Sequence, residues 1–388
     1  MRCEARLYRV ALPMRIPFDH PAARRRTADS LVLSLTADGA TGIGECAPRR
    51  YVTGETTGTV EAALRAFPLE TVFARLLDTP AEQLLAELRE HGFRKTFSVD
   101  GGNNLVCLLE TAVLDLLTRS LSLRLDELLP GERRAPVPVS QVLDLSMGVT
   151  EFLETRGPFH FVKVKASGDV DRDVRTVSTL RDRLAPGVPV MVDANMSWTP
   201  ATAADHARRL RAAGATLVEE PLPPRSWEAL RTLRRETGVR VMLDESVCTL
   251  DDARQAVAQD ACDAVNVRVA KNGGLLASLR LVEFAREAGL DFQIGVQVAE
   301  TGPLINAGRA LALHCPDALT VEAGQSDRFF PETIVSPAPV VDRAANTIGT
   351  FPGPGLGLRL NARAEHWAAL SWSPDDAWRP VPPPEENS

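Results

Sequence analysis

Lysine is scarce in this chain, and the few lysines present are the first candidates for chemistry. The 388 residues contain 44 lysines and arginines together, of which only Lys95, Lys163, Lys165 and Lys271 are lysines. An arginine keeps its proton in proteins, whereas a lysine whose charged form is disfavoured can act as a base. Lys163 and Lys165 lie in the alternating stretch 161–165, and Lys271 ends a second alternating stretch, so both have the periodicity of strands. These positions suggest proton transfer, although charges at strand ends are often simply solvated.

Acidic residues occur between these lysines at a nearly constant interval. Asp193, Glu219 and Asp244 divide the segment from Lys165 to Lys271 into steps of 28, 26, 25 and 27 residues, each comparable to one strand–helix unit. Strand ends at this interval would converge on one mouth of a barrel. Carboxylates brought together raise one another's pKa unless a cation neutralises them. Mg²⁺ prefers oxygen ligands and is the expected ion, with Mn²⁺ as an alternative.

Two lysines on opposite sides of a metal suit the removal of a proton next to a carboxylate. The metal and nearby cations would stabilise the negative charge of the enediolate that forms when this weakly acidic proton leaves. One lysine would take the proton, and the other would donate to the opposite face or stabilise charge. A Schiff-base aldolase that forms an imine at Lys271 is an alternative from another enzyme class. A binding protein that kept the barrel but lost turnover is a third reading.

The lysines and carboxylates can meet at one mouth only if strands alternate with helices, and the sequence after position 137 has this alternation. Strands are predicted at 138–142, 161–165, 188–193, 216–220, 239–244, 264–270, 291–298 and 318–322. Helical spacing lies between them, for example at 201–213, 227–237, 250–259 and 275–288. Eight similar units favour a closed parallel barrel over an open doubly wound sheet.

The residues before position 137 have a different pattern. Alternating runs predict antiparallel strands at 3–11 and 31–37, and helical spacing occurs at 59–66, 81–90 and 104–118. An α+β domain is therefore expected before the barrel. The tail from Ser373 is polar and proline-rich, and we expect it to be ordered only where it docks.

Composition and charge disfavour several other classes of protein. The net charge is −7 and no basic patch is interleaved with aromatics, so no nucleic acid partner is expected. No apolar run has membrane-spanning length and no signal peptide is evident, which predicts a cytoplasmic protein without a membrane partner. The six cysteines lack metal-binding spacing and are expected to be reduced. None of the six histidines stands at the C-terminal end of a predicted strand, which disfavours histidine-based metal sites and racemisation.

The ordered motifs of the chain resemble those of the enolase superfamily, in its muconate-lactonizing-enzyme branch. That branch includes muconate cycloisomerases, dipeptide epimerases, N-acylamino acid racemases and o-succinylbenzoate synthases. The motifs are GIGECAP at 42–48, KVK at 163–165, VDAN at 192–195, VEEP at 218–221, DES at 244–246, KNGG at 271–274 and GPGLG at 353–357. The resemblance covers nearly the whole chain.

The resemblance implies an α/β fold class, with a (β/α)7β barrel (a modified TIM barrel) and an α+β N-terminal capping domain. The implied domains are a capping domain with specificity loops at 1–135, the catalytic barrel at 136–345, and a C-terminal segment at 346–388 that returns to the capping domain. Relatives often assemble as homo-oligomers, so a homo-oligomer is expected.

The resemblance also implies roles for individual residues. The implied metal ligands are Asp193, Glu219 and Asp244. Lys165 and Lys271 would form the acid/base pair, and Lys163 would contact the substrate carboxylate and tune Lys165. The residues expected in outer positions or against substrate are Asn195, Glu220, Glu245, Glu300, Glu322, Tyr51 and Arg24.

Substrate specificity in this family comes largely from two capping-domain loops, expected here at 14–27 and 49–57. Arg24, in a run of three arginines, could recognise an anionic group. Dipeptide epimerases of this branch carry an Asp-x-Asp pair on the last barrel strand, whereas this chain has the single acid Glu322. The expected substrate is a small carboxylate, and the expected reaction is racemisation or epimerisation of an amino acid whose amino group is masked. Cycloisomerisation and syn-elimination use the same site and are alternatives.

Overall fold

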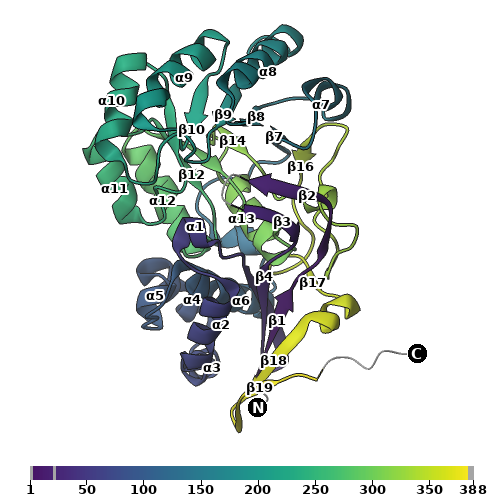
Figure 1. Ribbon diagram of the computed structural model, residues 1–388. Helices are drawn as coiled ribbons and strands as arrows, with labels where there is room; N and C mark the ends of the chain where they lie inside the picture. The colour runs from purple at the N-terminus through teal and green to yellow at the C-terminus, as the bar shows by residue number, and fades with distance from the viewer. Residues whose placement is uncertain (1–2, 21–22, 383–388) are drawn as a thin grey trace.

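The eight strands of the second part of the chain form one parallel sheet that closes into a barrel (Figure 1). The computed structural model describes residues 3–20 and 23–382. The barrel strands are β7 (Gln141–Leu143), β8 (Val162–Lys165), β9 (Val190–Asp193), β10 (Leu217–Glu219), β11 (Val241–Leu243), β12 (Ala264–Val267), β13 (Asp291–Ile294) and β14 (Thr320–Val321). Each pairs in parallel with its sequence neighbour. The N–H of Ser140 donates to the Val321 carbonyl oxygen at 2.8 Å, so the first and last strands meet.

A helix follows each of the first seven of these strands. The helices are α7 (Val149–Thr155), α8 (Val170–Arg183), α9 (Pro200–Ala212), α10 (Trp227–Thr237), α11 (Leu250–Ala258), α12 (Leu275–Glu287) and α13 (Pro303–Leu313). The order is (β/α)7β, as predicted. The bounds of α10 are also as predicted, because Gly238 ends the helix in the left-handed conformation with φ of 63°.

Two predicted strands continue too far, because β13 ends at Ile294 instead of residue 298 and β12 is also shorter than predicted. The sequence predicts a strand over 264–270, but β12 ends at Val267. Turn hydrogen bonds replace the ladder there, from Asn272 N to Arg268 O and from Gly274 N to Val269 O. Lys271 therefore lies in a turn beyond the strand rather than at its end.

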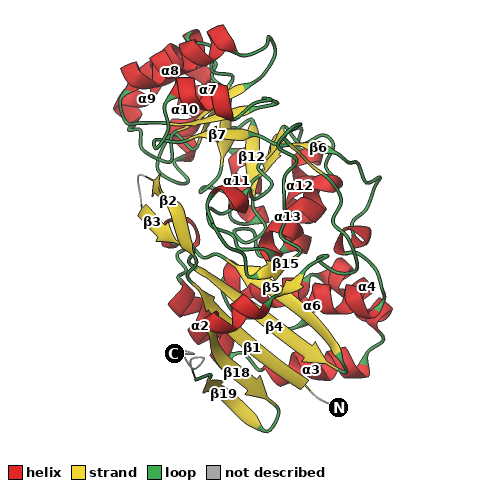
Figure 2. Ribbon diagram, turned by 90° about the vertical axis from the view of Figure 1, so that its right-hand side faces the viewer, coloured by secondary structure: helices red, strands yellow, loops and turns green. Residues whose placement is uncertain are grey.

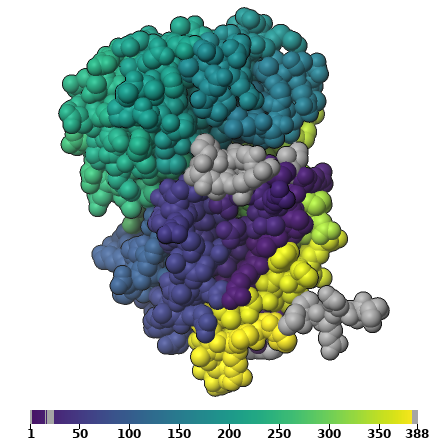
Figure 3. Space-filling view, viewed as in Figure 1, coloured from purple at the N-terminus to yellow at the C-terminus, as the bar shows by residue number. Residues whose placement is uncertain are grey.

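The second sheet is antiparallel and has the order β19-β18-β1-β4-β5. Its strands are β1 (Cys3–Val10), β4 (Ser30–Ala37), β5 (Ala40–Cys46), β18 (Ala368–Ser373) and β19 (Asp376–Pro380). The proline-rich tail is ordered through β19 because β18 pairs with β1 and β19 with β18. Figure 3 shows these late strands, in yellow, against the purple N-terminal strand, with the barrel on the other side.

Helix α6 (Asn103–Ser120) lies between the antiparallel sheet and the barrel. It packs on β4 and β5 on one side and contacts α12 and α13 on the other. Its residues 104–118 are all buried, as expected for a helix covered on several faces. Gly44 of β5 permits the close approach, because a Cβ at this position would stand 2.2 Å from the Leu108 carbonyl oxygen. The other helices of this part are α2 (Thr57–Ala66), α3 (Leu69–Asp78), α4 (Ala81–His91) and α5 (Phe93–Thr96).

Buried carboxylates of this layer cap two barrel helices. Glu45 of β5 accepts from the N–H groups of Thr301, Gly302 and Leu304 at 2.7, 3.1 and 3.0 Å, where α13 begins. Glu110 of α6 accepts from the N–H of Leu276 in the first turn of α12 at 3.1 Å. The first N–H groups of a helix lack partners within the helix, so these acids bind the two parts of the molecule together.

The two predicted specificity loops contain regular structure. The first forms a hairpin of β2 (Pro13–His20) and β3 (Ala23–Thr27), and the second contains α1 (Arg50–Thr53). Cross-strand pairing makes the first segment a hairpin, which lies between the sheet and the barrel in Figure 2. The Arg15 N–H donates to the Phe329 carbonyl oxygen at 2.8 Å, so β2 is attached to the segment after β14.

Short elements complete the described chain. They are the pairs β6 (Val137–Pro138) with β16 (Thr347–Ile348) and β15 (Val335–Ser336) with β17 (Arg359–Leu360), and the 3₁₀ helices η1 (Leu125–Leu128), η2 (Ser326–Arg328) and η3 (Ala362–Trp367). All six cysteines are buried free thiols. Within the described ranges, no helix has the length and apolarity needed to cross a bilayer.

Candidate active site

The inside of the barrel has an apolar layer and a polar layer. The apolar layer consists of Phe161, Met191, Leu217, Met242 and Ala264, which pack together. Side chains two residues apart on a strand share a face, so the next inward positions form the polar layer. Those positions hold Lys163, Asp193, Glu219, Asp244 and Asn266. The polar layer therefore lies at the C-terminal ends of the strands, where barrel enzymes carry their active sites.

Lys163 and Lys165 project from β8 onto the carboxylates of the neighbouring strands. The Lys163 amine lies 3.1 Å from Asp193 Oδ2, 2.7 Å from Glu219 Oε2 and 3.0 Å from Glu322 Oε1. The Lys165 amine donates to Asp193 Oδ2 at 2.6 Å and to Asn195 Oδ1 at 3.0 Å. The register of the strands explains why these lysines meet the carboxylates, because Lys165 of β8 is paired with Asp193 of β9, and Asp193 with Glu219 of β10. The structure thus brings these predicted residues together.

The ion pairs shift the pKa values of this cluster in opposite directions. Burial alone would raise the pKa of Asp193, but Lys165 and Lys163 hold it well below its ordinary value. Burial alone would lower the pKa of Lys163, but Glu219, Glu322 and Asp193 raise it well above its ordinary value. The three carboxylates therefore favour the charged form of the Lys163 amine.

Lys271 has a different environment from the other two lysines. Its amine is fully buried and donates to Asp244 O at 2.7 Å, Asp244 Oδ1 at 2.9 Å and Asn266 O at 2.7 Å. Lys163 and Lys165 line the cavity at the barrel mouth, whereas Lys271 is not among the described residues that line it. Burial, with a contribution from Arg268, lowers the pKa of Lys271 to about 8. The structure thus places Lys271 beside Asp244 and behind the cavity wall.

Glu220 and Glu245 are buried residues that follow β10 and β11, and they differ in their hydrogen-bond partners. Glu220 accepts from Asp244 N at 2.7 Å and from Ser246 N at 3.1 Å, which ties the end of β10 to the end of β11. Glu245 lines the cavity, yet neither of its carboxylate oxygens has a hydrogen-bond partner in the described part of the chain. Burial raises the pKa of Glu245 to about 8, helped by repulsion from Glu220, Asp193 and Glu219.

The chemistry of this residue fits a hard cation, because Glu245 offers carboxylate oxygens that have no partner among the described residues. Buried polar groups normally have partners, and Mg²⁺ takes carboxylate oxygens at such sites. Within the residues that the structure describes, no three acidic, histidine or cysteine side chains are spaced to hold a metal together. Asp193 and Glu219 contact the Lys163 amine, and Asp244 contacts Lys271 and Arg268. The predicted ligand set therefore stays a prediction.

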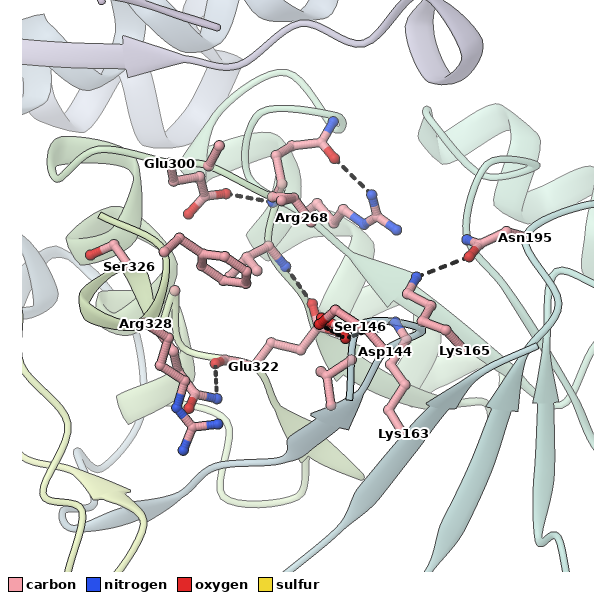
Figure 4. Close-up of a pocket in the computed structure, with 18 of the residues that line it drawn as sticks. Asp144, Ser146, Lys163, Lys165, Asn195, Arg268, Glu300, Glu322, Ser326 and Arg328 are labelled. Atoms are coloured by element: carbon pink, nitrogen blue, oxygen red, sulfur yellow. Dashed lines mark hydrogen bonds and ion pairs between the residues drawn. The ribbon is translucent and has the colours of Figure 1, made fainter. Parts of the chain in front are cut away.

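The other predicted residues lie around the same cavity, except one. Glu300, Glu322 and Asn195 line it (Figure 4). The half-buried Tyr51 lines it as well. Glu322 Oε2 accepts from Val296 N at 2.9 Å, and Glu300 Oε1 accepts from Gln297 N at 2.6 Å. Burial and the nearby Glu45 raise the pKa of Glu300 well above its ordinary value. The Arg24 side chain lies outside the described residues.

Sequence reasoning missed several residues at this site. Arg268 contacts Asp244 and donates to Gln297 Oε1 at 2.7 Å, and Asn266 donates to Glu219 Oε1 at 2.8 Å. Period-two alternation along β12 could have identified Asn266, which faces inward two residues after Ala264. Arg268 gave no signal because it is one arginine among many.

A closed barrel with ammonium and carboxylate groups gathered at its strand ends defines an enzyme of the TIM-barrel class. A model of the family described as Enolase C-terminal domain-like matches residues 145–364. The chain is 26% identical to o-succinylbenzoate synthase of Bacillus subtilis (strain 168) over 362 residues, which cover 92% of this chain and 93% of that protein. It is 28% identical to a chloromuconate cycloisomerase of Cupriavidus necator over 313 residues, which cover 79% of this chain and 81% of that protein.

A solved structure has the same fold. N-succinyl Arg/Lys racemase from Bacillus cereus superposes with a TM-score of 0.83 at 22% identity, over 96% of this chain and 100% of that chain. The chain belongs to the enolase superfamily, in its muconate-lactonizing-enzyme branch. It is a proton-abstracting enzyme of that superfamily, whose relatives are isomerases and a lyase.

Proposed function

We propose that the protein is a Mg²⁺-dependent racemase or epimerase that removes the proton next to a carboxylate of a small amino-acid derivative. The observation that carries the proposal is the position of Lys165. Its amine lines the cavity and is held between Asp193 and Asn195, at 2.6 and 3.0 Å. A base in such a position can meet a substrate carbon while its direction is fixed.

In this proposal, Asp193, Glu219 and Asp244 would hold the metal, and Glu245 lies at the end of the same strand as Asp244. Bound there, Mg²⁺ would stabilise negative charge on the substrate carboxylate as a Lewis acid, and enolase-superfamily sites combine a Lys or His base with such ions. Mn²⁺ is the alternative ion. Lys163 would add a positive charge at the same place, where its amine lies 3.0 Å from Glu322 Oε1.

The role of Lys271 separates racemisation from the alternatives. Inversion requires a proton donor on the face opposite Lys165, so the Lys271 amine must reach the substrate from its position beside Asp244. Cycloisomerisation or syn-elimination requires a base on one face only, with Lys271 stabilising charge. The names of the two relatives, a cycloisomerase and o-succinylbenzoate synthase, keep both reactions as alternatives. The aldolase alternative is weaker, because it gives the Lys165 amine and the carboxylates Asp193, Glu219 and Asp244 no shared task.

The test is proton exchange in D₂O with the Mg²⁺-loaded protein and a panel of N-acylated amino acids, followed by mass spectrometry. We expect deuterium at the carbon next to the carboxylate in both enantiomers. Lys165→Arg should abolish exchange of one enantiomer and Lys271→Arg exchange of the other. Exchange with neither enantiomer of any tested carboxylate would refute the proposal, whereas exchange of one enantiomer only would favour the one-base reactions.

A further inference from the structure

Lys271 is held at both ends, by its side-chain amine and by its backbone carbonyl group. The amine donates to Asp244 and to the Asn266 carbonyl oxygen, which belong to the barrel. The Lys271 carbonyl oxygen accepts from Asn103 Nδ2 at 2.8 Å, and Asn103 is the first residue of α6, outside the barrel. One end of this lysine is therefore attached to the barrel and the other to the capping domain.

The same amide of Asn103 also holds the loop after the neighbouring barrel strand. Its Nδ2 donates to the Cys248 carbonyl oxygen at 3.0 Å, and Cys248 follows β11 in the segment that begins with Asp244. Asn272 Nδ2 donates to the same carbonyl oxygen at 3.2 Å, so the loops after β11 and β12 are joined there. Asn103 thus fixes the turn that carries Lys271 relative to the segment that carries Asp244.

Arg94 sets the direction of the Asn103 amide. Its guanidinium donates to Asn103 Oδ1 at 3.3 Å, and to the carbonyl oxygens of Val99 and Gly101 at 3.1 and 2.6 Å. Because a guanidinium group only donates, Asn103 presents its oxygen to Arg94 and its NH₂ group to the two carbonyl oxygens. The turn after β12 packs closely on this amide, since a Cβ at Gly273 would stand 3.2 Å from Asn103 Oδ1.

The start of α6 is attached in turn to the second predicted specificity loop, 49–57. Glu55 of that loop accepts from Asn104 N at 3.1 Å and from Asn104 Nδ2 at 2.8 Å. Tyr51 of the same loop lines the cavity. The loop that lines the cavity and the turn that carries Lys271 are therefore both attached to the first two residues of α6.

We infer that Asn103 is a positioning residue for Lys271, so that the capping domain sets the place of one of the two proton-transferring lysines. The inference rests on the proposed function, in which the Lys271 amine must reach the face of the substrate opposite Lys165. Because Lys271 is fully buried beside Asp244, the place of its amine depends on the place of its backbone. A displacement of about 1 Å at a reacting group can cost about 10²-fold in rate.

The first test is exchange in D₂O by the Mg²⁺-loaded protein, measured for the two enantiomers of one N-acylated amino acid. The variants are Asn103→Ala, which removes the amide, and Asn103→Asp, which keeps its size but turns an acceptor oxygen toward the two carbonyl oxygens. Asn361→Ala is the matched control, because Asn361 Nδ2 also donates to two carbonyl oxygens, those of Thr333 and Val335, at 3.0 and 3.3 Å. None of these three control residues is among the described residues that line the cavity.

We expect both Asn103 variants to slow the exchange that depends on Lys271 by about 10²-fold and to leave the exchange that depends on Lys165 unchanged. A variant that merely destabilised the fold would slow both exchanges alike. Asn361→Ala should change neither exchange, and the thermal unfolding midpoint of each variant is measured in parallel.

The second test needs no turnover and uses the scarcity of lysine. With isotope-labelled lysine, NMR spectra contain only the signals of Lys95, Lys163, Lys165 and Lys271, and the signals of Lys271 are those that Lys271→Arg removes. Asn103→Ala should shift the carbonyl-carbon and side-chain signals of Lys271 and leave those of Lys163 and Lys165 in place.

Equal slowing of both exchanges by the Asn103 variants, or no change in either, would overturn the inference and leave the proposed function standing. Exchange of neither enantiomer by the wild type would count against the proposed function instead. The NMR spectra would then decide the inference, because shifted Lys271 signals would support it and signals that stay in place would overturn it.

Discussion

Lys165→Arg is the sharpest test of the assigned base. An arginine can keep the ion pair with Asp193, so the fold and the charge of the site should survive the change. An arginine has a pKa above about 12, so at pH 8 fewer than about one guanidinium in 10⁴ is neutral. General-base catalysis contributes about 10²–10⁴-fold, and we therefore expect proton exchange to fall by about 10³-fold.

The assay is the rate of deuterium incorporation at saturating Mg²⁺, with the thermal unfolding midpoint measured in parallel. Lys95→Arg is the matched control, because Lys95 is the one lysine outside the site and is exposed on α5. Its exchange rate should equal that of the wild type. If Lys165→Arg retained exchange within about tenfold of the wild type while binding metal normally, Lys165 could not be the base.

Three further predictions concern the metal and the fold. Asp244→Asn should weaken Mg²⁺ binding by about tenfold or more, since it removes a charged ligand, and calorimetric titration measures this; unchanged affinity would exclude Asp244 as a ligand. Glu110 has a pKa of about 7 in the folded protein, raised by burial from 4.5, so its contribution to stability is full below about pH 4.5 and is lost as the pH rises through 7. Glu110→Gln should therefore gain about 2–3 kcal/mol relative to the wild type between pH 5 and pH 8 in urea denaturation, and a pH-independent difference would contradict this. Gly44→Ala should destabilise by about 1–3 kcal/mol or more, because its Cβ would meet backbone atoms of α6, whereas Gly349→Ala, with open space around it, should be nearly neutral in the same assay.

The barrel and its polar layer could be predicted because both follow from alternation along strands. Each successive strand–helix unit carries a charged residue at an inward position of its strand. Lys165, Asp193 and Glu219 are such residues, and they recur at the interval of the strands. Such a repeat needs no knowledge of long-range packing. The same logic failed at Lys271, because the alternating sequence continues past the point where turn hydrogen bonds end β12.

The features that sequence reasoning missed depend on contacts between distant segments. Arg156 and Arg328 line the same cavity only because the first and last strands of the barrel meet, and neither has a local pattern that distinguishes it from the other arginines. The burial of Glu110 against the first turn of α12 likewise depends on how the two parts pack. The sequence predicts a loop at 14–27, whereas the structure has a hairpin there. The register of this hairpin is set by cross-strand pairing and by its attachment at Phe329, and neither contact can be predicted from local sequence.

The pairing of β1 with β18 has a consequence for how the molecule is assembled. The partner of β1 is nearly the whole length of the chain away in sequence, and the barrel is made between the two. Until β18 arrives, one edge of β1 has its peptide groups open to pairing with a foreign strand. The strands that complete the antiparallel sheet thus come last in the chain, and removal of residues 368–380 should yield a protein that self-associates through β1 although all barrel strands are present.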